Sequence, residues 1–434
     1  MKKIYAAIAT LSSLLLLILP SFGAAAAAPN TFAALPAEAR SGIFATLGRS
    51  GLAFQMAALT SSNPGSDDDL GLSVAISGNT IVVGDPSASV NGISQGAAYV
   101  FVKPGSGWEN MTQTAELTAS SGTANALFGV SVAIEGNTIV VGADNETVNG
   151  QTAAGEAYVF VKPATGWADA TETATLLPRS AKCPVECNFG ASVAISGGTV
   201  VVGAPGTSGV ANASGAAYVF VKPASGWKNM TQTAELTNVD GQSNALFGGS
   251  VAISSTTVVV GASDQDSGFG RAYVFVAPST GWKNMTQTAE LSASSETQKY
   301  HLGKLVAISG NTIAAAAPDA DSGAGVVYIY VEPASGWIDS SESAQLKNAQ
   351  NTEIGYSLAF DGNEIATSGI TDDIAYIYVK PASGWSTTSR SNFSVTNGDS
   401  SYAFGASLAL SGETVVVGAP KPPSPGAAYV FTPQ

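Results

Sequence analysis

The chain has 434 residues, of which 45% are hydrophobic, 12% are charged and 48 are glycine. It carries 32 acidic and 18 basic residues, so its formal net charge is −14. This negative charge excludes binding to nucleic acid or to an anionic membrane by electrostatic attraction. The composition also excludes a disordered chain and is typical of a β-rich extracellular protein.

Residues 1–28 have the pattern of a secretory signal peptide. Lys2 and Lys3 give a charged start, an apolar core runs from Leu11 to Leu19, and the alanines at 24–28 offer an A-x-A cleavage site. The apolar core is shorter than a membrane-spanning helix. We therefore expect an exported protein that is secreted, periplasmic or on the cell surface, without membrane insertion. Residues 29–51 are expected to form a linker.

The rest of the chain is a seven-fold internal repeat with two constant spacings. Each repeat opens with an FG-type pair, and a small residue follows thirteen residues after the opening glycine. A tyrosine comes next, and in six repeats a tryptophan stands nine residues after that tyrosine. Such a repeat, built from short apolar runs, predicts a radial array of sheets. The opening glycines are Gly71, Gly129, Gly190, Gly248, Gly303, Gly355 and Gly405.

Four short strands are predicted in each repeat. In the first repeat, two apolar runs within residues 73–84 flank Gly78-Asn79, which is a tight hairpin signal. Residues 97–102 are aromatic and β-branched and indicate a third strand, and residues 114–118 indicate a shorter, half-polar outer strand. Four antiparallel strands are the unit of a propeller blade, whereas solenoid coils are usually much shorter. We therefore predict an all-β, seven-bladed β-propeller over residues 52–434.

The two ends of the chain predict how the ring closes. The seventh repeat stops after its third strand, at residues 429–431, and so lacks a fourth. Residues 54–60 (FQMAALT), which precede the first repeat, match the fourth-strand pattern. The N-terminal strand is therefore expected to complete the last blade and to remove the open edge of the ring.

One face of the predicted propeller collects all the variation in length. The connection between the second and third strands and the crossing to the next repeat both vary, and in a four-stranded meander these two lie on the same face. Binding residues collect in variable loops, so this face is the candidate ligand-binding surface. It is also acidic. Its candidate residues are Asp85, Asp144, Asp264, Asp266, Asp319, Asp321, Asp372 and Asp373.

Two loops on this face alternate carboxylates before a glycine. Asp264 and Asp266 lie in SDQDSG, and Asp319 and Asp321 lie in PDADSG. Alternate residues of a turn can direct two carboxylates at one Ca²⁺, which makes these four the candidate metal ligands. The other interpretation is that Asp, Ser and Gly simply form turns. It is favoured because neither loop has a third acidic ligand.

Cys183 and Cys187 are four residues apart in the loop before the third repeat. In an oxidising compartment they could close a short disulfide. A metal site there would need partners that the single histidine, His301, does not supply. That histidine is interpreted as the residue that replaces the phenylalanine of the FG pair in the fifth repeat.

The six tryptophans allow two interpretations. Indole faces stack on sugar rings, which would make the protein a lectin. A large aromatic at a fixed place in every blade more often fills the gap between neighbouring sheets, and we favour packing for this reason. The tryptophans are Trp108, Trp167, Trp227, Trp282, Trp337 and Trp385.

The FG pairs, the hairpin, the string VVGAP at 201–205 and 416–420, and GAAYVF resemble the FG-GAP repeats of the integrin α-subunit propeller. Related repeats occur in bacterial surface proteins. The resemblance implies the propeller fold. Calcium-binding members carry D-x-D/N-x-D-G in the first hairpin, whereas this chain has SGNT at 77–80 and SGGT at 196–199. The family's calcium site is therefore expected to be absent from these hairpins.

Catalysis has little support in the residues. No G-x-S-x-G motif is present, and the single histidine does not complete a triad. We expect a monomeric, non-enzymatic binding or adhesion propeller that engages a protein or glycan ligand through the acidic face. A lectin-like, sugar-binding propeller is the first alternative. A glycoside hydrolase that uses a pair of carboxylates is the second.

Overall fold

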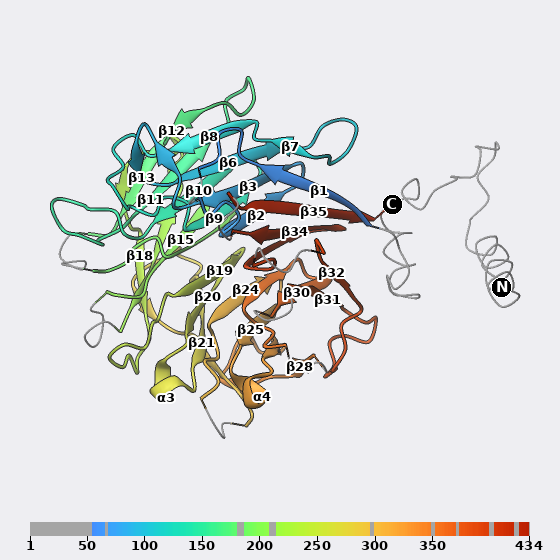
Figure 1. Ribbon diagram of the computed structural model, residues 1–434. Coiled ribbons are helices and arrows are strands. Elements are labelled where there is room, and N and C mark those ends of the chain that lie inside the picture. Colours follow the sequence, from blue (N-terminus) through green and yellow to red (C-terminus); the bar gives the residue numbers. More distant parts are fainter. Residues whose placement is uncertain are drawn as a thin grey trace, which may run out of the picture. The chain divides into compact units, whose positions relative to one another are not determined.

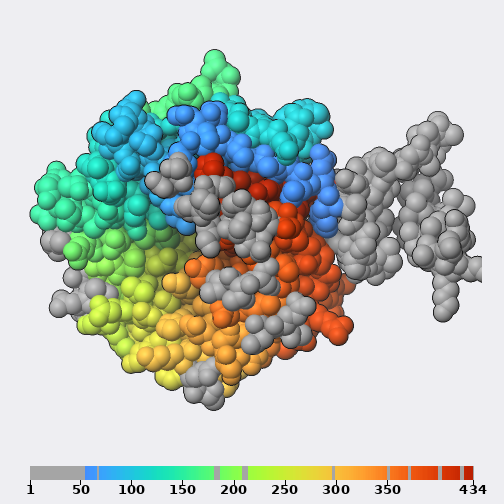
Figure 2. Space-filling model, in the orientation of Figure 1, coloured from blue at the N-terminus to red at the C-terminus, as the bar shows by residue number. Residues whose placement is uncertain are grey.

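The computed structural model describes residues 54–65, 68–179, 186–207, 214–295, 299–348, 352–369, 373–398, 403–420 and 425–433. These residues form an all-β propeller of seven blades (Figure 1). The expected signal peptide (1–28) and linker (29–51) lie outside the described residues. The blades follow one another around the molecule in chain order, and the first strand lies beside the last (Figure 2).

Each blade is a four-stranded antiparallel meander, as predicted, and the blades are numbered here by their innermost strands. In order from blade 1 to blade 7, the innermost strands are β2 (Ser73–Ser77), β9 (Ser131–Glu135), β14 (Ser192–Ser196), β19 (Ser250–Ser254), β24 (Leu305–Ser309), β29 (Ser357–Phe360) and β33 (Ser407–Ser411). The second strands are β3 (Thr80–Asp85), β10 (Thr138–Ala143), β15 (Thr199–Ala204), β20 (Thr257–Ala262), β25 (Thr312–Ala317), β30 (Glu364–Ser368) and β34 (Thr414–Ala419).

The third and fourth strands continue each sheet outward. The third strands are β6 (Ala97–Val102), β11 (Glu156–Val161), β16 (Ala216–Val221), β21 (Arg271–Val276), β26 (Val326–Val331), β31 (Ala375–Val379) and β35 (Ala427–Pro433). The fourth strands are β8 (Ala115–Thr118), β13 (Ala174–Leu177), β18 (Ala234–Thr237), β23 (Ala289–Ser292), β28 (Ala344–Leu346), β32 (Phe393–Val395) and, in blade 7, β1 (Phe54–Thr60).

The N-terminal strand closes the ring. β1 pairs antiparallel with β35, in a register from Phe54↔Pro433 to Leu59↔Ala428. Figure 1 shows β1 alongside β35. The predicted completion of the last blade is therefore confirmed, and the seventh sheet has no unpaired edge on its third strand.

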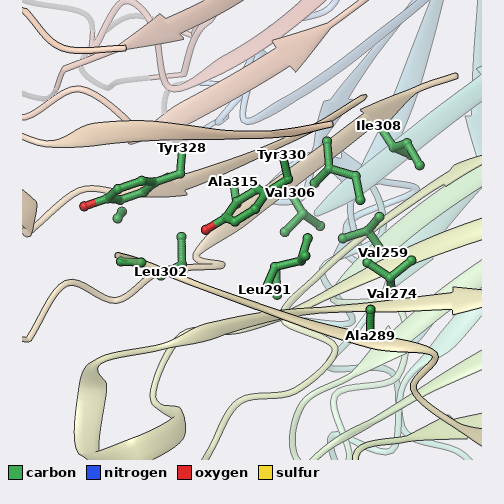
Figure 3. Close-up of a cluster of buried hydrophobic side chains, with 14 of the residues drawn as sticks. Val259, Val274, Ala289, Leu291, Leu302, Val306, Ile308, Ala315, Tyr328 and Tyr330 are labelled. Atoms are coloured by element: carbon green, nitrogen blue, oxygen red, sulfur yellow. The ribbon is translucent and has the colours of Figure 1, made fainter. Parts of the chain in front are cut away.

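The second strands are buried along nearly their whole length, because both of their faces pack against neighbouring blades. This explains their continuous apolar runs, since strands covered on both faces do not alternate. The described hydrophobic residues form seven clusters, each between two adjacent blades. Figure 3 shows the cluster between blades 4 and 5, where Val259 and Leu291 meet Val306, Ala315 and Tyr330.

The tryptophans belong to these clusters. Four are buried, with exposed fractions of 2–8%: Trp108, Trp167, Trp227 and Trp337. Trp282 and Trp385 are half-buried and pack against the clusters of blades 3–4 and 5–6. The packing interpretation is therefore confirmed for the four buried indoles, and their faces are not available for stacking on a sugar.

The spacing of thirteen residues has a steric cause at the blade junctions. In blade 3, a Cβ on Gly203 would lie 1.9 Å from the carbonyl oxygen of Gly248, the opening glycine of the next blade. The same carbonyl accepts a hydrogen bond of 2.9 Å from Ser192 Oγ. The junction that closes the ring repeats this contact, because Ser407 Oγ donates to the Gly71 carbonyl over 2.7 Å. The opening glycine and the glycine thirteen residues later thus hold neighbouring inner strands in close contact.

A fifth, parallel strand at the outer edge was not predicted. In five blades, two residues of the following blade pair with the fourth strand; β12, for example, pairs Ala170 with Leu117 of β8. Asp169 Oδ1 accepts a 2.9 Å hydrogen bond from the Glu116 amide beside this contact. Among the described strands, the five are β7 (Met111–Thr112), β12 (Ala170–Thr171), β17 (Met230–Thr231), β22 (Met285–Thr286) and β27 (Ser340–Ser341).

Candidate ligand-binding face

The variable connections lie together on one face, as predicted. Gly96, from the connection between the second and third strands of blade 1, forms a parallel β-bridge with Phe128 in the crossing to blade 2. Thr123 of the same crossing donates to Glu146 in the corresponding connection of blade 2 through its backbone amide (3.1 Å) and its hydroxyl (2.6 Å). We call this surface the loop face. It consists of the connections between second and third strands together with the crossings between blades.

Asp85 belongs to a strand and not to the exposed loop. It is the last residue of β3 and is fully buried, so it cannot contact a macromolecular partner directly. Its Oδ1 accepts a hydrogen bond of 2.9 Å from the Asp69 amide, and its Oδ2 has no partner among the described residues. Burial, followed by the neighbouring carboxylate of Asp68, raises the pKa of Asp85 to about 7.

Asp144 follows β10 directly and is half-buried. Its Oδ1 is buried and finds no hydrogen-bond partner among the described residues. Burial raises the pKa of Asp144 to about 6. Asp144 is thus partly withdrawn from the surface that it was predicted to form.

Two of the four candidate metal ligands form ion pairs with cationic side chains of the protein itself, and the other two contact a histidine. Asp266 forms an ion pair of 2.7 Å with Arg271, and Asp321 forms one of 3.1 Å with Lys347. The loops that carry them contain two short helical turns, α3 (Gln265–Gly268) and α4 (Ala320–Gly323). Asp266 and Asp321 both have left-handed backbones within these turns, with φ of 53° and 55°.

The other two members of this set, Asp264 and Asp319, meet at His301. Asp264 Oδ1 lies 3.4 Å from His301 Nε2, and Asp319 Oδ2 contacts His301 Nδ1. The structure therefore brings together one carboxylate from blade 4, one from blade 5 and the histidine of the crossing between them. No group of three or more His, Cys, Asp or Glu side chains within the described part of the chain is arranged to hold a metal ion.

The position of His301 differs from the sequence interpretation. Leu302 is fully buried and bridges Gly270, as Phe247 bridges Gly215 one blade earlier. Leu302 thus takes the place of the phenylalanine in the FG pair, and His301 stands one residue before it. Its left-handed backbone (φ 52°) is shared by Leu127 and Leu246 at the same place in other blades. Its side chain can therefore turn outward toward the loop carboxylates.

The remaining predicted residues are structural or lie outside the described part. Asp373 Oδ1 accepts a hydrogen bond of 3.1 Å from the Phe404 amide and thereby joins the loop of blade 6 to the crossing into blade 7. Asp372 lies outside the described residues. Cys187 is buried and disulfide-bonded, and the other cysteine of the chain, Cys183, lies outside the described residues.

Exposed apolar side chains on the loop face were missed by the sequence reasoning. Of the nine large hydrophobic residues that are exposed in the described part, five lie there. Two of them, Leu72 (38% exposed) and Tyr356 (52%), directly follow opening glycines and so lie where innermost strands begin. Their position after the FG pair is the signal that could have revealed them. The five are Leu72, Ile93, Val239, Leu246 and Tyr356.

Comparisons with known proteins agree with this architecture. A family described as "FG-GAP repeat" matches residues 54–101, 111–160, 186–220, 230–275 and 390–431, which together make up half of the chain. A search of curated proteins finds no match. Among solved structures, the chain is similar to the WD40 β-propeller domain of Doa1, with 12% identity and a TM-score of 0.52 over 88% of this chain and 97% of that one. That likeness concerns the fold alone.

Within the described part of the chain, no helix has the length and hydropathy needed to cross a bilayer.

Proposed function

Because this chain belongs to the FG-GAP repeat family, we propose that it is an exported, non-enzymatic binding propeller that engages a protein ligand through its loop face. Propellers of this family bind partners in general, but the fold alone does not determine which surface makes the contact. The observation that carries the proposal is that exposed apolar side chains and partly exposed carboxylates share the loop face.

The apolar side chains favour a protein partner. Tyr356 is 52% exposed and Val239 is 58% exposed. Exposed aromatic and aliphatic side chains surrounded by polar groups are typical of protein-protein contact surfaces. Ion pairs such as Asp321–Lys347 add charged groups of both signs to the loop face. Charged groups at a contact surface contribute to partner selection more than to affinity.

A sugar ligand is less well supported, because the side chains that would stack on it are used elsewhere. Four of the six repeated tryptophans are buried between blades. The residual alternative is a glycan bound by polar loop residues, without an aromatic platform. Export itself rests on the N-terminal pattern of residues 1–28, and sequencing of the mature N-terminus would test it.

The test compares matched pairs of substitutions on opposite faces. One variant combines Leu72→Ser with Tyr356→Ser on the loop face. The control combines Val331→Ser with Ile338→Ser, which are similarly exposed (43% and 51%) but lie at the other end of the blades. Each propeller is immobilised and exposed to the exported proteins of the cells that make it, and captured proteins are identified and their affinity measured.

A specific partner should bind the wild type and the control equally and should bind the loop-face variant at least tenfold more weakly, which corresponds to about 1.4 kcal/mol. If the control loses the partner while the loop-face variant keeps it, the assignment of the binding surface is wrong.

A further inference from the structure

Asp85 stands at a position that other blades fill with a smaller side chain. The position in question directly follows the small residue that stands thirteen residues after the opening glycine. It is alanine in five blades and glycine in blade 6. Those alanines are fully or almost fully buried, and so is Asp85. Blade 1 therefore places a carboxyl group where its neighbours place a methyl group. The equivalent residues are Ala143, Ala204, Ala262, Ala317, Gly369 and Ala419.

Other carboxylates surround this buried group. Asp68 is 6% exposed, and its Oδ2 accepts a 2.5 Å hydrogen bond from the Gly65 amide. Asp69 Oδ2 accepts a 2.5 Å hydrogen bond from Ser87 Oγ, while its amide donates to Asp85. Tyr99 in β6 lies close to these groups: burial raises the pKa of its hydroxyl, and the charges of Asp85 and Asp68 add to the rise.

No described lysine, arginine or histidine forms an ion pair with Asp68, Asp69 or Asp85. Glu116 adds a further negative charge near Tyr99. Like charges buried without a counter-charge are costly, and a proton on one carboxyl removes the repulsion. Asp85 is the group best placed to carry that proton, since it is fully buried and its Oδ2 accepts no hydrogen bond.

The cluster lies at the seam where the ring closes. Asp68 and Asp69 belong to the crossing that leads from the closing strand β1 into blade 1. Leu70 of this crossing also forms a parallel β-bridge with Gly426 in blade 7. A group that attaches this crossing to blade 1 therefore acts on the closing strand as well. We propose that Asp85 is a proton-dependent latch, which holds the crossing and the closing strand in place when its carboxyl is protonated and loosens them when it is ionised.

The direction of the pH effect follows from the pKa of Asp85. Its folded-state value is raised to about 7 from an ordinary value of 3.8, so the docked crossing retains a proton that the open one has lost. The attachment is strongest below about pH 4, weakens as the pH rises toward 7 and stays weak above it. These two pKa values give an opening constant that rises roughly thirty-fold between pH 5.5 and pH 8.

Hydrogen exchange of the whole protein tests the latch. Exchange of peptides from residues 54–70 is measured at pH 5.5 and pH 8 and corrected for the intrinsic pH dependence of exchange. The wild type should show the thirty-fold rise, and the peptide covering residues 119–128 in the next crossing should not. Asp85→Asn keeps an acceptor for the Asp69 amide and cannot ionise, so its rise should be below threefold. Asp85→Ala, which restores the residue found in five of the other blades, gives a second non-ionising variant.

Asp144→Asn serves as the matched control, because it removes a second carboxyl of raised pKa that lies away from the seam. It should keep the thirty-fold rise. Unchanged protection of the wild type across this pH range would refute the latch, as would a rise that persists in both Asp85 variants. Recovery of protection at pH 8 on addition of Ca²⁺ alone, in the wild type but not in Asp85→Asn, would overturn the proton in favour of a bound cation.

Discussion

A methyl group on Gly203 provides a direct test of why the repeat keeps a spacing of thirteen residues. In Gly203→Ala the new Cβ would lie 1.9 Å from the Gly248 carbonyl oxygen and 2.3 Å from Ser192 Oγ. Contacts of a Cβ below 3.0 Å are essentially never seen, so blades 3 and 4 would have to separate by about 1 Å or more. The hydrogen bond from Ser192 to Gly248 would be lost as well.

These two effects set the expected magnitude. Overpacking of a tight junction costs about 1–3 kcal/mol, and the lost hydrogen bond costs about 1 kcal/mol more. The free energy of unfolding should therefore fall by about 2–4 kcal/mol. For a propeller of about 380 residues, an unfolding entropy of about 2 cal/mol/K per residue converts this into a fall in Tm of about 3–5 °C.

The assay is urea unfolding followed by tryptophan fluorescence, with Tm from calorimetry. Gly105→Ala is the control, because its Cβ would meet nothing within 4 Å and its backbone is not left-handed. It should unfold within about 0.5 kcal/mol of the wild type. If Gly203→Ala is equally harmless, close approach of the inner strands is not the reason for the glycine.

Three further substitutions and the addition of Ca²⁺ test other parts of the structure. Trp227→Ala empties a buried site between blades 2 and 3 and should lower the free energy of unfolding by about 3–5 kcal/mol, measured by urea unfolding; a loss below about 1 kcal/mol would contradict its packing role. Asn229→Ala removes the 2.9 Å hydrogen bond from the Thr175 amide and should lower the free energy of unfolding by about 1 kcal/mol, as read from the urea midpoint; an unchanged midpoint would show that solvent replaces the bond without loss. Asp144→Asn should raise stability by about 1–2 kcal/mol at pH 7 and have little effect near pH 4, because the raised pKa of about 6 makes the wild type lose stability between those values; equal effects at both pH values would contradict this. Addition of Ca²⁺ should leave Tm unchanged, because Asp264 and Asp319 are held by His301; a rise of several degrees would show a calcium site.

The fold was predictable because the repeat itself records the packing. The opening glycines and the small residues thirteen positions later mark contacts between blades, and a fourth-strand pattern at residues 54–60 marks the closure. Blades 5 and 6 show how the pattern can change. In blade 5, Ala316 stands thirteen residues after the opening glycine, and Leu305 stands where the other blades have a serine in the innermost strand. In blade 6, Ser368 stands thirteen residues after the opening glycine and itself donates a hydrogen bond of 2.6 Å to the Gly405 carbonyl. Both blades lie largely outside the matched family segments.

The site was less predictable because its contacts join residues of different blades. Asp264 and Asp319 were paired with their own loop neighbours, whereas the structure joins them through His301. That histidine was misplaced because Leu302 can fill the phenylalanine position and the sequence pattern does not show which residue does so. The burial of Asp85 could have been inferred, because the aligned residue is alanine in five other repeats.

The short outer strands define where a module of this protein begins. Each of β7, β12, β17, β22 and β27 is covalently part of one blade but hydrogen-bonded to the blade before it. A cut at the opening glycine would therefore keep in a blade the short strand that it lends to the blade before it, and would remove the one that it receives from the blade after it. Two of the matched family segments begin at residues 111 and 230, the first residues of β7 and β17. For inserting or deleting a blade, the natural boundaries are these short strands. A fragment from residue 111 to residue 169 would begin with β7, the strand that pairs with the preceding blade.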